Sequence, residues 1–342
     1  MSSSTPSGRL ARTVAFFRRH PVLLLLAFTP GIPEYLSGSS STALLAVSPF
    51  VFLLFLGLNL GLYGPGVLLL REAWIRCGRS WGSLLLFGAG YGILEEGTAL
   101  STLFDPNASV VNTLGHYGRA AGVNWVWLIG ILGIHIVLSV GLPILLLGLA
   151  LPETRGRTLL SRNESWIAGG IFAIDILLLA LIVGFWRVEL AWLVGAVVVA
   201  VVLWTLAVEL PAGFLNPTRE RPRLGPGAFF LLGLAFFPII LLVPGLGEDF
   251  HFGAPLVGAV DLLLCAGLFF TVRQEIGRQD NAPHLILLAL GATLPIALIG
   301  LISQVGLPIE LVVDLLYGYF FWLLWKRYRA PSPAAPVDAV AA

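Results

Sequence analysis

The chain has 342 residues, of which 57% are hydrophobic and only 11% are charged, and its formal net charge is +1. A soluble domain carries about 25% charged residues, so this composition indicates a membrane protein and excludes one large soluble core. The small net charge excludes the basic footprint of a nucleic-acid-binding protein. The two cysteines, Cys77 and Cys265, offer no metal-ligand spacing and no disulfide framework.

The two ends of the chain differ from the apolar sequence between them. Residues 1–19 carry arginines and serines but no acidic residue, and a leucine run follows. This pattern resembles a signal or transit peptide, but it lacks a convincing small-residue cleavage site. We therefore expect residues 1–19 to be an uncleaved cytoplasmic leader, residues 20–329 to be a single transmembrane domain, and the low-complexity residues 330–342 to be a disordered cytoplasmic tail.

Hydrophobic segments of about the 20 residues needed to cross a bilayer recur along the chain. Pro30 and Pro33 interrupt the first, which we expect to be partly re-entrant, and Pro65 predicts a kink in the second. The predicted fold is an all-α polytopic membrane bundle of about ten transmembrane helices. The predicted spans are 20–36, 46–70, 81–104, 124–150, 166–186, 190–210, 227–245, 255–272, 284–303 and 307–325.

The distribution of basic residues sets the orientation. All but two of the 20 Lys and Arg residues, Arg119 and Arg187, fall on the same side of the predicted spans. Cytoplasmic loops carry an excess of Lys and Arg, so both termini are predicted to be cytoplasmic in a multi-pass protein of the plasma (inner) membrane. Four tryptophans near the outer span ends fit an aromatic belt: Trp125, Trp127, Trp186 and Trp192.

The third segment, LLLFGAGYGILEEGTALSTLF at residues 84–104, holds two adjacent carboxylates, Glu95 and Glu96. A charge in hydrocarbon costs several kcal/mol or more, so intramembrane acids usually face a cavity and serve a function. At about 1.5 Å of rise per residue, Glu95, His135, Asp175 and Asn59 all lie roughly 14 to 16 Å below the outer surface. The sequence therefore predicts a polar layer at one depth, in which Asn59 is a neutral amide that bridges helices.

Two more acids, Asp261 and Asp314, lie only about 9 Å below the outer surface. We expect them to line a water-filled outer mouth. No Lys or Arg lies at the depth of any of these acids, so each must be protonated, hydrogen-bonded, hydrated or bound to a cation.

Spans three and four are joined by one loop, which predicts that they pack as antiparallel neighbours. Gly88 and Gly92 form a small-xxx-small pair that lets another helix approach closely. Tyr91 lies one turn from Glu95 and is predicted to donate its hydroxyl to that carboxylate. Ser139 lies one turn from His135 and is predicted to contact the imidazole ring.

Glu95-Glu96 on one membrane helix, followed by His135-x-x-x-Ser139 on the next, resembles the CAAX-protease and bacteriocin-processing (CPBP) family of intramembrane proteases. The resemblance covers about residues 84–143 and implies that the glutamates and histidine activate a water for peptide hydrolysis. The chain departs from the family pattern at Leu100, where the family has arginine, and at Ile131, where it has phenylalanine. Ser139 replaces an asparagine or aspartate, and the sequence supplies one intramembrane histidine.

Three functions stay open at this stage. In an intramembrane protease, Glu95 would act as general base and His135 would orient the water or stabilise the oxyanion, with Asp175 completing the network. In a proton- or cation-coupled transporter, the same residues would form the relay or binding site. In a scaffold, the polar layer would only fix helix packing. Partners are the lipid bilayer and a membrane-embedded peptide or small cation; cofactor and metal use stay undetermined, since one histidine with carboxylates is a weak zinc set.

Overall fold

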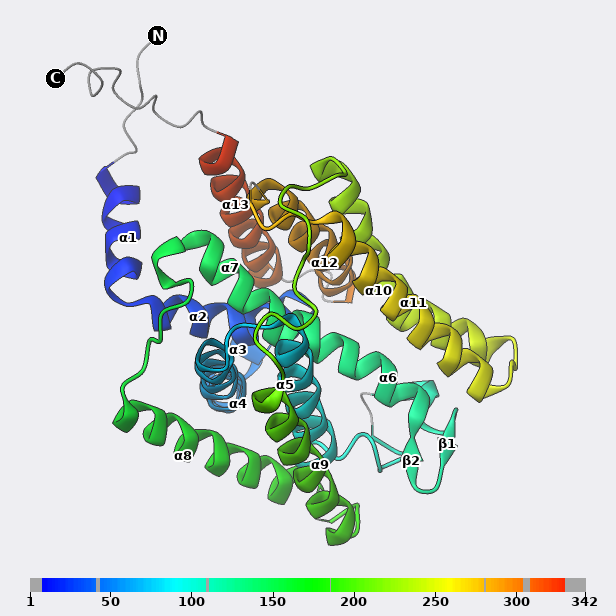
Figure 1. Cartoon of the computed structure of the whole chain (residues 1–342). Coiled ribbons are helices and arrows are strands. Elements are labelled where there is room, and N and C mark those ends of the chain that lie inside the picture. Colours follow the sequence, from blue (N-terminus) through cyan, green and yellow to red (C-terminus); the bar gives the residue numbers. More distant parts are fainter. Residues whose placement is uncertain are drawn as a thin grey trace, which may run out of the picture.

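The structure, a computed structural model, describes residues 8–40, 44–108, 111–184, 186–279, 281–303 and 308–329. Helices dominate these residues, and one short β-hairpin is described (Figure 1). Residues 8–19 of the predicted leader form α1, whereas residues 1–7 and the predicted tail, 330–342, lie outside the described ranges. The predicted all-α polytopic membrane bundle is confirmed.

The elements follow one another in chain order, with short 3-10 and π segments labelled η. They are α1 (Gly8–Arg19), α2 (Pro21–Pro30), η1 (Gly31–Leu36), α3 (Leu44–Val47), α4 (Pro49–Arg76), α5 (Trp81–Ile93), η2 (Leu94–Ala99), η3 (Asn112–Gly115), β1 (Arg119–Ala120), β2 (Val123–Asn124), α6 (Trp125–Ile134), η4 (His135–Gly141), α7 (Leu142–Ala150), η5 (Pro152–Thr154), α8 (Arg162–Leu179), η6 (Ala180–Gly184), α9 (Leu190–Glu209), α10 (Pro226–Asp249), α11 (Ala254–Glu275), α12 (Ala282–Ser303) and α13 (Pro308–Arg329).

Seven described helices are long and apolar enough to cross a membrane, and they match the second and the fourth to ninth predicted spans. The first predicted span is shorter: α2 has 10 residues and η1 has 6, which together rise about 24 Å. That length is less than the roughly 30 Å hydrocarbon core, as expected for a segment that ends inside the bilayer. The third and tenth predicted spans correspond to α5 with η2, and to α13.

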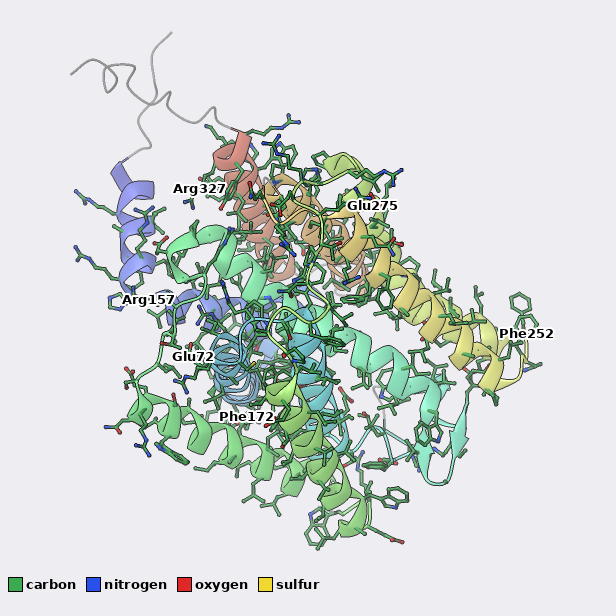
Figure 2. All side chains as sticks on the ribbon, in the orientation of Figure 1. Glu72, Arg157, Phe172, Phe252, Glu275 and Arg327 are labelled. Carbon is green, nitrogen blue, oxygen red and sulfur yellow. The ribbon has the colours of Figure 1, made fainter. Side chains whose placement is uncertain are left out.

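Apolar side chains on the outward faces of α8, α9 and α11 are exposed, as they must be where helices meet lipid. Figure 2 places Arg327 and Glu275 near one end of the molecule and Phe252 at the opposite tip of the α10–α11 pair. The basic end and the apolar flanks therefore agree with a bundle that stands across a membrane.

The continuous helix formed by α6, η4 and α7 runs through the middle of the molecule (Figure 1). Its side chains enter two separate cores. Leu138 and Leu142 join a cluster with α2, α10, α12 and α13, whereas Val140 and Ile144 join a cluster with α4, α5, α8 and α9. The central helix therefore holds the two halves together, and η4, which carries His135, lies where they meet.

The most extensive helix pair is α10 with α12, and glycines on both helices make the crossing possible. A Cβ at Gly233 would overlap the Leu288 carbonyl oxygen, and one at Gly291 would overlap the Phe230 carbonyl oxygen.

Because backbone atoms cannot move aside cheaply, Gly233→Ala is expected to destabilise the protein by about 1–3 kcal/mol. Thermal unfolding in detergent measures this loss. Gly245→Ala on the same helix is the control, because no atom lies within 4 Å of its Cβ position; equal losses in both variants would contradict the crossing argument.

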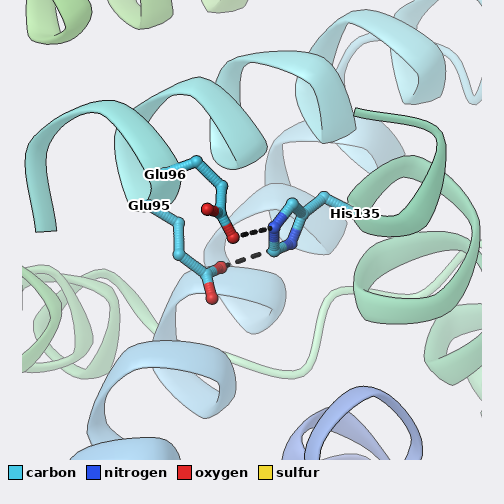
Figure 3. Close-up of side chains that lie close together, drawn as sticks. All are labelled: Glu95, Glu96 and His135. Carbon is cyan, nitrogen blue, oxygen red and sulfur yellow. Dashed lines mark hydrogen bonds and ion pairs between the residues drawn. The ribbon is translucent and has the colours of Figure 1, made fainter. Parts of the chain in front are cut away.

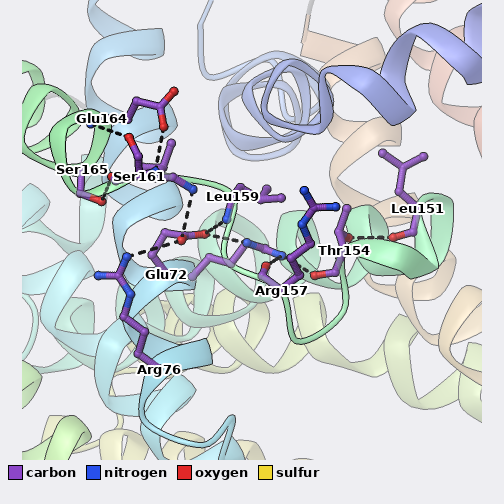
Figure 4. A network of polar contacts seen from close by, with 11 residues as sticks. Glu72, Arg76, Leu151, Thr154, Arg157, Leu159, Ser161, Glu164 and Ser165 are labelled. Carbon is purple, nitrogen blue, oxygen red and sulfur yellow. Dashed lines mark hydrogen bonds and ion pairs between the residues drawn. The ribbon is translucent and has the colours of Figure 1, made fainter.

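A buried polar network closes the basic end of α4 (Figure 4). The Arg71 guanidinium donates to Glu72 Oε1 at 2.8 Å and to the carbonyl oxygen of Thr154 at 2.6 Å. Glu72 also accepts the backbone N–H of Leu159 at 2.9 Å, and the backbone N–H of Leu160 at 3.4 Å. These contacts clamp the loop between α7 and α8 to the end of α4.

Candidate functional site

The candidate site lies where α5 and the central helix cross, and in both helices an α-helix changes to a π-helix at that level. Glu95 and Glu96 lie on η2, and His135 opens η4. Single π turns inside α-helices occur frequently at functional sites. The crossing depends on the predicted Gly88–Gly92 pair, because a Cβ at Gly88 would lie 2.9 Å from the Ile136 Cα and one at Gly92 would lie 3.0 Å from the His135 Cβ.

The imidazole of His135 bridges the two carboxylates (Figure 3). Its Nε2 lies 3.0 Å from Glu96 Oε1, and its Nδ1 lies 3.4 Å from Glu95 Oε2. Nδ1 is also 3.1 Å from the Ser139 hydroxyl, so the predicted Ser139 contact is present. All four side chains are buried. The structure therefore brings the predicted glutamates, histidine and serine into one cluster.

Glu96 is held from its other side by the chain just beyond η2. The Thr102 hydroxyl donates to Glu96 Oε2 and accepts the indole N–H of Trp127 at 3.1 Å. Because Thr102 contacts both the carboxylate and the first turn of α6, it fixes the orientation of Glu96 toward His135.

Glu95 is less constrained, and its surroundings leave polar atoms without partners. Among the described residues, neither Glu95 Oε2 nor the Tyr91 hydroxyl makes a hydrogen bond, although both are buried. The Tyr91 hydroxyl interacts with the Glu95 carboxylate, as predicted, but the two groups do not reach hydrogen-bonding geometry. The Tyr91 ring is instead held by stacking on Phe172, with centroids 6.0 Å apart, and by edge contact with His135 at 5.8 Å. A buried unpaired donor and acceptor so near each other call for a water or an ion.

A third carboxylate, Glu34, belongs to this region and was missed by the sequence argument. Tyr63 donates its hydroxyl to Glu34 Oε1 at 2.7 Å, and Ser40 donates to Oε2 at 2.6 Å. Glu34 interacts electrostatically with both Glu95 and His135. The sequence does show an acidic residue next to Pro33 in the first apolar segment, and this could have indicated Glu34. Because prolines interrupt that segment, the depth of Glu34 in the membrane cannot be counted along one regular helix.

The predicted polar layer divides into neighbouring groups. Asn59 donates to the hydroxyls of Ser40 and Tyr35, at 2.8 and 3.4 Å, and so lies on the Glu34 side. Asp175 on α8 packs against Gly61 and interacts electrostatically with Tyr91. Asp175 Oδ2 has no hydrogen-bond partner among the described residues. Their hydrogen-bond and electrostatic partners are therefore Ser40, Tyr35 and Tyr91 rather than His135.

The prediction that Asp261 and Asp314 line a water-filled outer mouth is not what the structure shows. Asp261 is fully buried, and its Oδ1 lies 3.9 Å from the Cys265 sulfur. Asp314 lines a separate cavity of about 230 Å³ between α12, α13 and η1, with mostly apolar walls. Depth along a helix says nothing about which face of the helix a residue occupies: Asp261 is buried inside the bundle, and Asp314 is half-buried beside an apolar cavity.

The Glu95, Glu96 and His135 side chains also form a set of metal ligands. Each offers one ligand atom, and the three atoms lie within 4.8 Å of one another. Carboxylate oxygen and imidazole nitrogen suit divalent ions such as zinc, and three protein ligands leave a coordination position open. The cluster therefore has the donors to hold a divalent cation as well as a proton.

Fold and site together define a polytopic all-α integral membrane protein with a glutamate–histidine cluster buried in its bundle. The chain belongs to an uncharacterized membrane protein family, whose family model matches residues 23–342. No curated protein and no solved structure matches the chain.

Proposed function

We propose that the protein is an intramembrane hydrolase that cleaves a peptide bond of a membrane-embedded substrate, with Glu95, Glu96 and His135 as its catalytic residues. One observation carries the proposal: His135 contacts both carboxylates while Glu95 keeps a buried oxygen without a hydrogen-bond donor, beside the unpaired hydroxyl of Tyr91. This arrangement suits a water molecule that one group deprotonates while another orients it.

In the proposed reaction, Glu95 takes a proton from a water molecule while the oxygen of that water attacks the scissile carbonyl carbon. The negative charge that develops on the carbonyl oxygen is stabilised by the Tyr91 hydroxyl, a donor with no other partner among the described residues. Glu95 then gives the proton to the departing amine nitrogen, and the C–N bond breaks. His135 orients the water, and Glu96 fixes the imidazole through Nε2.

The resemblance to CPBP proteases supports the proposal in the order of its residues, a glutamate pair followed by a histidine on the next helix. Leu100 and Ile131 still differ from the CPBP pattern, which has arginine and phenylalanine at these positions. Glu34, held by Tyr63 and Ser40, adds an acidic group that this pattern does not include. The proposed centre is therefore a glutamate–histidine cluster in which acidic groups outnumber histidines.

The test is cleavage of a library of apolar fluorogenic peptides by the purified protein in detergent, with the products identified by mass spectrometry. We expect cleavage that the Glu95→Gln/Glu96→Gln double variant lacks. Absence of cleavage, or equal cleavage by the double variant, would contradict hydrolysis.

Thr102→Val is expected to lower the hydrolysis rate on the order of tenfold, because it leaves Glu96 Oε2 and the Trp127 indole N–H without a buried partner. Thr102→Ser keeps the hydroxyl and should restore the rate, which a purely structural role of the threonine methyl would not explain. The measurement is the initial rate of peptide cleavage by both variants. A similar loss in Thr102→Ser would show that Thr102 does not position Glu96 through its hydroxyl.

A second candidate function is cation- or proton-coupled transport, which the clustering of acids favours. Three ligand atoms lie within 4.8 Å, Glu34 adds a third carboxylate nearby, and no Lys or Arg contacts this cluster among the described residues. Flux of H⁺ or Na⁺ into liposomes separates the two functions: a flux lost in Glu34→Gln, without peptide cleavage, would favour transport. A loss of folding alone in these variants would leave only a scaffold role for the cluster.

A further inference from the structure

One cavity lies away from the glutamate–histidine cluster, at the arginine-rich end of the bundle. It has a volume of about 520 Å³, within the range of roughly 300–1,000 Å³ that small-ligand pockets occupy. Glu95, Glu96 and His135 do not line it, but Ile136 and Val137, which follow His135, form part of its inner wall. The cavity is therefore a separate site that shares one helix with the proposed catalytic centre.

The walls of this cavity are mostly apolar, and all of its charged lining residues are positive. Leu84 and Leu85 come from α5, Leu145 from α7, and Leu285 and Leu288 from α12. The charged lining residues are four arginines, Arg71, Arg79, Arg155 and Arg278, and no described lining residue is acidic. A complementary ligand has an apolar body and an anionic group at one end.

Two of these arginines already have acidic partners. Arg71 is paired with buried Glu72, and an Arg278 nitrogen lies 3.8 Å from Glu220 Oε1. Neither Arg79 nor Arg155 lies within ion-pair distance of a carboxylate among the residues that the structure describes. The unneutralised positive charge of the cavity is therefore concentrated on Arg79 and Arg155, both of which are exposed.

Arg79 and Arg155 come from different loops but meet at the cavity. A Cβ at Gly156 would lie 2.9 Å from Arg79 Nη1, so the guanidinium rests against the backbone directly after Arg155. The Arg155 Nε donates to the Gly148 carbonyl oxygen at 2.6 Å, and its terminal nitrogens are left for a ligand. Two guanidinium groups that line one cavity without a carboxylate supply the charge and the hydrogen-bond donors that a phosphate requires.

We propose that this cavity binds an anionic phospholipid, with the phosphate between Arg79 and Arg155 and an acyl chain along the leucines of α5 and α12. A lipid fits better than a soluble anion because most of the wall is apolar and the protein stands in a bilayer. Trp74 and Trp81 also line the cavity, as tryptophans do at the level of lipid headgroups. The cavity lies on the side of the bundle that the positive-inside rule assigns to the cytoplasm, where basic clusters attract anionic lipids.

The experiment measures phosphatidylglycerol and phosphatidylcholine binding to the purified full chain in detergent by native mass spectrometry. We expect phosphatidylglycerol to bind on the order of tenfold more tightly than phosphatidylcholine, because both lipids carry a phosphate but only the choline headgroup adds a positive charge that the two arginines repel. Arg79→Gln/Arg155→Gln should remove this preference. Arg19→Gln/Arg162→Gln, which removes the same charge from the same side outside the cavity, should keep it. Size-exclusion profiles of both double variants verify that they fold.

Other outcomes would overturn the proposal. Equal loss of preference in both double variants would mean that only the general surface charge attracts the lipid. Competition by water-soluble glycerol phosphate at a similar concentration would make this a site for a soluble phosphate. Unchanged lipid binding by Leu285→Trp, which fills the apolar part, would show that no acyl chain enters. Glu95→Gln should bind phosphatidylglycerol as the unaltered protein does, so this test stands apart from the proposed hydrolysis.

Discussion

Glu95→Gln is expected to lower the rate of peptide hydrolysis by a factor of about 10² to 10⁴, the usual contribution of a general base. The amide keeps the size of the side chain but cannot take a proton from water. The fold should survive, because Glu95 Oε2 makes no hydrogen bond among the described residues and its contact with His135 is the longer of the two, at 3.4 Å. The measurement is single-turnover cleavage of the best peptide substrate, with thermal unfolding recorded in parallel.

Asp261→Asn provides a matched control for this prediction. Asp261 is also a fully buried acid within a membrane helix, with an oxygen that has no partner among the described residues, but it lies outside the glutamate–histidine cluster. We expect Asp261→Asn to keep the hydrolysis rate within a small factor of the unaltered protein. Equal losses in Glu95→Gln and Asp261→Asn would mean that any buried acid supports folding and that Glu95 has no special part in hydrolysis.

His135→Gln should lower hydrolysis as well, but for a different reason. The imidazole joins Glu95 to Glu96, and a glutamine can contact only one of them. Because residues that act as a unit have non-additive effects, the Glu95→Gln/His135→Gln double variant should lose little more than Glu95→Gln alone. Additive losses would show that the two residues act separately.

The sequence predicted the class of fold and the centre of the site for a common physical reason. Apolar segments of bilayer length and a strong bias in arginine placement can both be recognised in a single sequence. The high cost of charge in hydrocarbon likewise singled out Glu95 and Glu96, and the single loop between two spans correctly indicated that His135 lies beside them.

What the sequence could not predict depends on helix rotation and on departures from regular helix geometry. Residues on η1, η2 and η4 are turned relative to a continuous α-helix, so counting turns along a regular helix did not find Glu34. Depth estimates for Asp175 and Asn59 carried no information about the direction in which each side chain points. Thr102 was missed because it follows the end of η2, where no periodic pattern continues.

Glu72→Ala is expected to cost about 3–5 kcal/mol of folding free energy, the usual effect of removing one partner of a buried ion pair. Arg71 would keep its charge at about 2% exposure without a carboxylate, and the backbone N–H of Leu159 and of Leu160 would lose their acceptor. The loop that carries Arg155 would be released from α4 at the same time. Equilibrium unfolding in mixed micelles, followed by tryptophan fluorescence, measures the loss.

Glu153→Gln is the control for this stability prediction, because it removes a carboxylate from the same loop in an exposed ion pair with Arg18. Exposed pairs contribute roughly 0–1 kcal/mol, so this variant should unfold almost as the unaltered protein does. Arg71→Met/Glu72→Leu should be more stable than Glu72→Ala, because it removes the unpaired charge, although it forfeits the bonds from Arg71 to the loop carbonyl oxygens. If the double variant were no more stable than Glu72→Ala, the loop bonds of Glu72, and not the stranded charge of Arg71, would account for the loss.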